Sequence, residues 1–144
     1  MNKYILTIAL VELSFITIFF IKVTVFLTKN IDYSNTKKAH FAGGCFWGVE
    51  HLFEKQKGVK DVVSGFMGGH VRNPSYRAVI KGDTGHVETV EVVYDSSEIS
   101  YESLAKLFFE IHDSTQKNGQ GPDIGSQYLS VVFYENEEEK RTSE

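Results

Sequence analysis

The chain's only cysteine and its only tryptophan lie in the segment Gly43-Gly44-Cys45-Phe46-Trp47-Gly48-Val49-Glu50. A short apolar stretch precedes this segment and apolar residues at helical spacing follow it, which predicts Cys45 at or just before the first turn of a helix. The unpaired N–H groups and the dipole of a helix start favour a thiolate, the nucleophile of cysteine enzymes. A buried structural cysteine is the alternative, because free cysteines are among the most buried residue types.

A candidate acid, Glu88, lies where the first of two long loops ends. This loop leads into Gly82-Asp83-Thr84-Gly85-His86-Val87-Glu88, and the β-branched run that follows predicts a strand. Strand alternation places Glu88 on the same face as Val90, Val92 and Tyr94. If that face is buried, the pKa of Glu88 is raised and the carboxyl stays protonated near neutral pH, as a general acid must. An exposed glutamate at the strand end is the alternative.

Two phenols and a second carboxylate are further candidates for the site. Tyr76 follows Pro74-Ser75 in the first loop, and the second loop ends in Gly121-Pro122-Asp123-Ile124-Gly125-Ser126-Gln127-Tyr128. Long loops in a small domain often carry function. Asp123, Tyr76 and Tyr128 are therefore treated as candidate site residues.

The elements that must position these groups alternate between strands and helices. Strands are predicted at 39–42, 59–66, 87–94 and 127–134, and helices after Cys45 and after Ser100, with a single helical turn at 75–80. The charged tail at 135–144 resembles the start of another helix. This order predicts an α/β or α+β two-layer sandwich, with helices packed on a sheet, in one domain at 39–144.

The first 29 residues differ in composition from the rest of the chain. Residues 4–27 are apolar apart from Glu12 and Lys22, are long enough to cross a bilayer as a helix, and lack a small-residue cleavage site. We therefore expect a hydrophobic signal-anchor helix at 1–29 that tethers the protein to a membrane, then a linker at 30–38. Cleavage would instead give a secreted protein, and a cytoplasmic protein is a further alternative. Lysines on both sides of the span leave its orientation open.

Composition and residue counts exclude several classes of protein. A net charge of −4 argues against nucleic acid as a partner, and one cysteine allows no intrachain disulfide.

A metal site is not predicted, because His86 and Glu88 share a strand face without a third ligand. A cysteine hydrolase would pair Cys45 with a histidine. The sequence indicates no such pairing among the five candidates, His40, His51, His70, His86 and His112.

Taken together, the three quoted segments resemble the signatures of the peptide methionine sulfoxide reductases of the A type. Their order and spacing agree with that family over about residues 39–134, and Pro74-Ser75-Tyr76 matches as well. The resemblance implies a fold built around a mixed sheet, with the active cysteine at a helix start. It also implies reduction of the S epimer of methionine sulfoxide, free or in proteins, and so a role in protein repair under oxidative stress.

The resemblance assigns a chemical role to each matching residue. Cys45 would attack the sulfoxide sulfur and become a sulfenic acid. Glu88 would donate a proton or a strong hydrogen bond to the sulfoxide oxygen, with Tyr76 and Tyr128 as further donors.

Three other residues would complete the substrate site. Phe46 and Trp47 would form the apolar wall around the methyl group of the substrate. Asp123 would not contact the substrate and would act through the residues that do. No bound cofactor is expected.

The sequence departs from the family pattern in three respects. There is no second cysteine to resolve the sulfenic acid, so recycling would need an external thiol, thioredoxin or glutathione. The chain also ends sooner than family members usually do, and Phe66 replaces a common tyrosine. We therefore expect a C-terminally truncated reductase domain. An inactive, membrane-tethered remnant that at most binds partners is the alternative function.

Overall fold

The computed structural model describes residues 34–144. The hydrophobic helix expected at 4–27, and the part of the expected linker before residue 34, lie outside the described residues. Within 34–144, no helix is both long and apolar enough to cross a bilayer.

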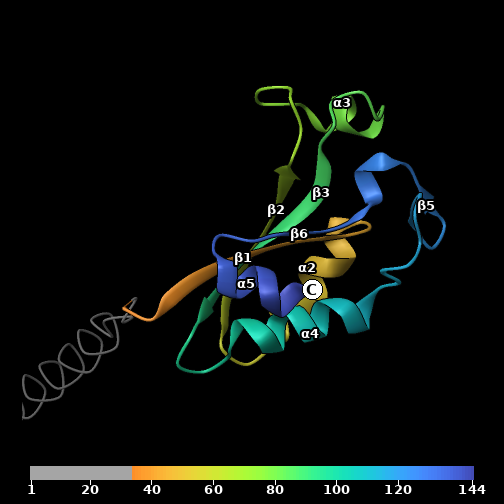
Figure 1. Ribbon diagram of the computed structural model, residues 1–144. Coiled ribbons are helices and arrows are strands. Elements are labelled where there is room, and N and C mark those ends of the chain that lie inside the picture. Colours follow the sequence, from red (N-terminus) through yellow and green to blue (C-terminus); the bar gives the residue numbers. More distant parts are fainter. Residues whose placement is uncertain (1–33) are drawn as a thin grey trace, which may run out of the picture. The chain divides into compact units, whose positions relative to one another are not determined.

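A four-stranded antiparallel sheet forms the centre of the described fold (Figure 1). Its order is β2-β3-β1-β6, with β1 at Thr36–Gly43, β2 at Val59–Met67, β3 at Val87–Asp95 and β6 at Ser130–Phe133. All three neighbouring pairs are antiparallel, so the expected mixed sheet is wrong for the described strands. The strands β1 and β2 run in the same direction, but they are not neighbours. Strand β3 lies between them and pairs antiparallel with both. A sequence pattern of strand, helix and strand does not reveal such an insertion.

Four helices and a small second ladder complete the described elements. The helices are α2 at Phe46–Glu54, α3 at Tyr76–Ile80, α4 at Tyr101–Ile111 and α5 at Glu137–Ser143, and the ladder pairs β4 at Gly119–Gln120 with β5 at Asp123–Ile124. A 3₁₀ turn, η1, covers Ser126–Tyr128.

Two strand starts differ by three residues from those predicted, and the other boundaries agree to within one residue. The predicted strand at 127–134 begins only at Ser130, because the N–H of Tyr128 donates to the carbonyl of Gly125 (3.1 Å) and closes a turn. At the other end, β1 starts at Thr36, within the range expected as linker, because Lys37 and Lys38 already pair with β3.

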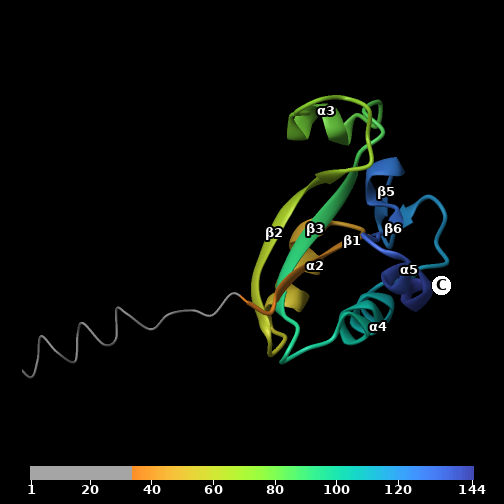
Figure 2. The same ribbon diagram turned by 60° about the vertical axis from the view of Figure 1, so that its left-hand side comes forward.

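The core lies between one face of the sheet and the helices α2 and α4 (Figure 2). Phe41 of β1 stacks on Phe53 of α2 (5.2 Å between ring centroids) and on Phe108 of α4 (5.0 Å). Helix α4 begins as predicted, with Ser100 Oγ accepting the N–H of Ser103 (3.1 Å), and its apolar stripe buries Leu104 completely. The predicted two-layer arrangement of helices on a sheet is confirmed.

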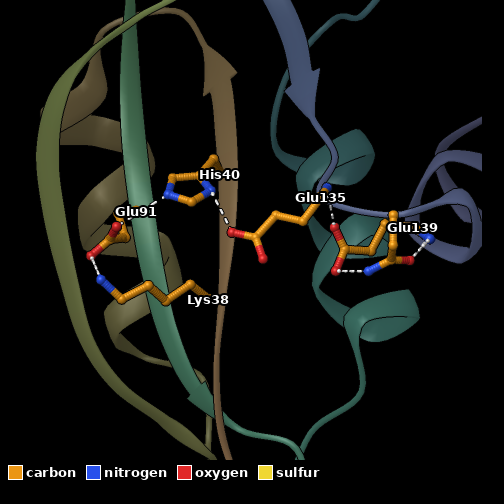
Figure 3. A network of polar contacts seen from close by, with 6 residues as sticks. Lys38, His40, Glu91, Glu135 and Glu139 are labelled. Atoms are coloured by element: carbon orange, nitrogen blue, oxygen red, sulfur yellow. Dashed lines mark hydrogen bonds and ion pairs between the residues drawn. The ribbon is translucent and has the colours of Figure 1, made fainter.

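The other face of the sheet carries a polar network (Figure 3). Glu91 of β3 accepts from Lys38 Nζ (2.7 Å) and lies 3.1 Å from His40 Nε2. The second ring nitrogen of His40 lies 4.0 Å from Glu135 Oε1, just before α5. Asn136 caps α5 by accepting the N–H groups of Glu138 and Glu139. The network links the central strands to the segment leading into α5.

Candidate active site

Cys45 lies in the turn between β1 and α2, as the sequence predicts. It occupies the N-cap position of α2, is partly exposed, and its carbonyl accepts the N–H of Gly48 (3.1 Å). The preceding Gly44 has φ +101°, in the left-handed region that favours glycine. A Cβ at Gly44 would also lie 2.7 Å from Gln120 Cβ. The turn that presents the sulfur therefore requires glycine for two separate reasons.

Glu88 is buried beside this turn, so the exposed alternative is wrong. Its side chain is 2% exposed, and its Oε2 accepts the N–H of Phe46 (3.1 Å), the first N–H of α2. Its other oxygen, Oε1, is buried and has no hydrogen-bond partner among the described residues. Burial raises the pKa of Glu88, the Phe46 N–H opposes this rise, and the charge of Asp123 adds to it. The site thus holds a buried carboxyl group with a raised pKa and one oxygen that no described residue binds.

Four aromatic rings cover the start of α2. Phe46, 6% exposed, lies 5.6 Å from Trp47, 5.7 Å from Phe66 and 6.3 Å from Tyr76, measured between ring centroids. Trp47 also stacks on Tyr76 at 6.3 Å. Trp47 and Tyr76 are 64% and 44% exposed. The predicted wall residues therefore form one cluster, with a buried base and an exposed rim.

The second loop brings Tyr128 and Asp123 toward the same place. Burial raises the pKa of Tyr128, the Gln127 side chain opposes this, and the charges of Glu88, Tyr76 and Asp123 raise it further. The backbone of Asp123 pairs with that of Gln120, whose side chain packs against Gly44 before the cysteine, and the turn η1 that carries Tyr128 packs on β3, which carries Glu88. The structure thus brings all seven predicted site residues to one end of the sheet.

Sequence reasoning missed the glutamines of the second loop. Gln127 is 6% exposed, its side chain opposes the rise in the pKa of Tyr128, and a Cβ at Gly125 would contact its amide. Gln120 packs on Gly44. The available signal was the repeated placement of glycine beside glutamine, as in Gly119-Gln120-Gly121, since glycine permits close approach of a neighbouring side chain.

The candidate histidines make other contacts. His112 lies 2.5 Å from the carbonyl of Phe108 and 2.7 Å from Ser130 Oγ, and His40 faces Glu91. His86 is 9% exposed, and its Nδ1 has no partner among residues 34–144. Within that range, no three histidine, cysteine or acidic side chains are arranged to hold a metal ion.

Comparison with known proteins agrees with this geometry. The family model described as peptide methionine sulfoxide reductase matches residues 37–144. The chain belongs to this family. It is 50% identical over 109 residues to the peptide methionine sulfoxide reductase MsrA of Natronomonas pharaonis, covering 76% of this chain and 61% of that protein. Against three such curated relatives the chain spans about three fifths of their length, 61%, 55% and 65%.

Solved reductase structures have the same fold. Methionine sulfoxide reductase A of Corynebacterium diphtheriae superposes with a TM-score of 0.72 at 35% identity, covering 76% of this chain and 55% of that one. Mxr1 from Saccharomyces cerevisiae in reduced form gives a TM-score of 0.72 at 35% identity, covering 78% and 67%.

Proposed function

We propose that this protein reduces the S epimer of methionine sulfoxide to methionine, with Cys45 as nucleophile and Glu88 as acid. The observation that carries the proposal is the placement of Glu88. A buried carboxyl accepts the N–H of the residue next to Cys45 with one oxygen, while its other oxygen has no hydrogen-bond partner within residues 34–144. A group with that placement can act on an atom bound beside the sulfur.

The proposed reaction begins with a proton or strong hydrogen bond from Glu88 to the sulfoxide oxygen, which makes the sulfoxide sulfur electrophilic. The Cys45 sulfur attacks, the sulfur–oxygen bond of the substrate breaks, and the oxygen passes to the cysteine. Methionine sulfoxide and a thiol thus become methionine and the sulfenic acid of Cys45, so one sulfur is reduced as the other is oxidised. The raised pKa of Glu88 supports this role, because an ionised carboxylate has no proton to donate.

The phenols of Tyr76 and Tyr128 are proposed as further donors to the sulfoxide oxygen. Their preorganised hydroxyls would stabilise the charge that develops as the sulfur–oxygen bond breaks. Phe46 and Trp47 are proposed to bind the methyl group, since the exposed rim and buried base of the aromatic cluster offer it an apolar surface. Asp123 is proposed to act indirectly, through the pKa of Glu88.

Regeneration of the thiol is proposed to use an external reductant, because the chain has a single cysteine. Thioredoxin and glutathione both supply the thiol that attacks a sulfenic acid. Mxr1 from Saccharomyces cerevisiae has been solved in complex with Trx2, which supports a protein reductant. Membrane attachment through residues 4–27 stays a prediction, as do secretion and a cytoplasmic location.

A reductase assay on both sulfoxide epimers tests the proposal. The full chain is incubated with dithiothreitol and a peptide containing either S- or R-methionine sulfoxide, and methionine formation is measured. We expect turnover of the S epimer and none of the R epimer. No turnover of either epimer would refute the function and leave the inactive remnant as the alternative.

A further inference from the structure

The second loop is closed by two side-chain amides that pair with backbone groups. Gln120 Oε1 accepts the N–H of Asp113 (3.0 Å), and Gln120 Nε2 donates to the carbonyl of Asp113 (3.0 Å). Gln116 pairs with Gly121 in the same reciprocal way (2.8 and 3.3 Å). Each amide satisfies both polar backbone groups of one residue, as a neighbouring strand would.

Gln120 also contacts the turn that presents Cys45. Its Cβ and Cγ would lie 2.7 and 2.8 Å from a Cβ at Gly44, so its methylene stem packs directly on the glycine before the cysteine. The backbone of Gln120 pairs with Asp123 in the β4–β5 ladder. One residue therefore contacts Asp113, just after the C-cap of α4, the cysteine turn and the strand that carries Asp123.

We propose that Gln120 is a positioning residue of the reductase site: its amide closes the loop on Asp113 and thereby holds Asp123 in place against the Cys45 turn. This inference rests on the proposed function for the identity of the site as a reductase site. The contacts of Gln120 belong to the described fold and do not depend on that function.

Loss of the Gln120 amide is expected to change the pKa of Glu88. Asp123 on β5 raises the pKa of Glu88 by its charge. The other titratable groups around Glu88 are His86, two residues earlier in the chain and also buried, and Tyr128 on η1. Cys45 precedes Phe46, whose N–H binds Glu88, and Tyr76 on α3 stacks on the Phe46 ring. Without the amide of Gln120, the polar groups of Asp113 turn to water and the loop gains conformational freedom. Asp123 is then farther from Glu88 on average, and the pKa of Glu88 falls.

The test compares variants that differ in this amide. Gln120→Met keeps the length of the stem on Gly44 and removes both hydrogen bonds. Asp123→Asn removes the charge that the amide is proposed to hold in place. Gln56→Met is the matched control, because Gln56 Nε2 also donates to a backbone carbonyl, that of Leu52 (3.1 Å), outside the second loop.

The readout is the titration midpoint of the Glu88 carboxyl, followed by ¹³C NMR on the full chain. We expect the midpoint to fall in Gln120→Met and Asp123→Asn, to fall no further in the double variant, and to stay unchanged in Gln56→Met. A loss of stability alone would not move this midpoint. In the reductase assay, the pH above which the rate declines should shift downward in the same two variants.

An unchanged midpoint in folded Gln120→Met overturns the proposal. If that variant does not fold, Gln120→Asn replaces it: the shorter stem cannot reach both backbone groups, so the same fall is expected and an unchanged midpoint is equally decisive. The NMR titration needs no turnover. A chain without reductase activity would therefore defeat the proposed function while the role of Gln120 is still decided.

Discussion

Replacing Glu88 by glutamine separates the chemistry of this residue from its packing. The amide has the same shape and can accept the Phe46 N–H in place of Oε2. It puts an NH₂ group at the position of Oε1, which has no partner in the part of the chain that the structure describes. It cannot transfer a proton to a sulfoxide oxygen. The fold should survive, and only the proposed acid step should be lost.

The expected loss of activity is large. A positioned general acid contributes roughly 100- to 10,000-fold to a rate, so kcat/KM of Glu88→Gln should fall within that range, or by about 3–5 kcal/mol of transition-state stabilisation. Wild-type activity should itself decline as the pH rises through the raised pKa of Glu88, because the carboxyl then loses its proton.

As the pH rises, the free energy of unfolding of Glu88→Gln should increase relative to wild type, even though the variant is less active. The pKa of Glu88 in the folded protein lies above its ordinary value of 4.5, so the stability it contributes is complete below that value and is lost as the pH rises through the folded pKa. Glutamine does not titrate. The free energy of unfolding of Glu88→Gln, relative to wild type, should therefore increase with pH over this window, by about 1.4 kcal/mol for each unit between the two pKa values.

Glu91→Gln provides the matched control, because Glu91 lies on the same strand and faces the opposite side of the sheet. Lys38 holds the pKa of Glu91 below its ordinary range, so its contribution to stability is lost as the pH falls, and the relative stability of this variant should show the reverse trend. Its reductase rate should match wild type. Urea unfolding between pH 4 and 8 and the peptide assay supply both readouts. Wild-type turnover in Glu88→Gln, or equal loss in both variants, would refute the acid assignment.

Four further substitutions test other parts of the site and of the fold. Cys45→Ser should abolish reduction while leaving the thermal unfolding temperature nearly unchanged, and any retained turnover would contradict its role as nucleophile. Tyr128→Phe should lower kcat about tenfold, as expected for one lost hydrogen bond, and an unaltered kcat would remove it from the oxygen-binding group. Gly44→Ala should cost more than about 1 kcal/mol in urea unfolding, since its φ is left-handed and Gln120 occupies the space of a Cβ; a neutral effect would contradict that tight contact. Lys38→Ala should cost less than about 1 kcal/mol, because its ion pair with Glu91 is exposed, and a larger loss would show that the network of Figure 3 stabilises the fold.

Local rules predicted the position of Cys45 and gave burial of Glu88 as one of two alternatives, which the structure then decided. The glycine pair before Cys45 and the apolar spacing after it mark a helix start, and alternation along β3 places Glu88 with Val90 and Val92, both fully buried. These features depend on a few neighbouring residues and on the period of each element. One sequence was therefore enough to place Cys45 and to set the strand face of Glu88, but not to tell whether that face is buried.

Features that depend on contacts between distant segments were not predicted. The antiparallel sheet results from β3 inserting between β1 and β2, and nothing in the composition of the three strands records their order. Gln120 looks like an ordinary polar loop residue until its amide is seen on Asp113 and its stem on Gly44. The strand predicted at 127–134 began too early, because the turn at Gly125 depends on backbone hydrogen bonding rather than on apolar alternation.

A single-turnover reaction without reductant tests the central claim most directly. The chain is mixed with excess peptide S-methionine sulfoxide, methionine is quantified, and Cys45 is analysed by mass spectrometry after trapping with a sulfenic acid reagent. The account predicts one methionine per chain and one trapped adduct, on Cys45, with neither formed in Cys45→Ser. Methionine formation without oxidation of Cys45 would contradict it.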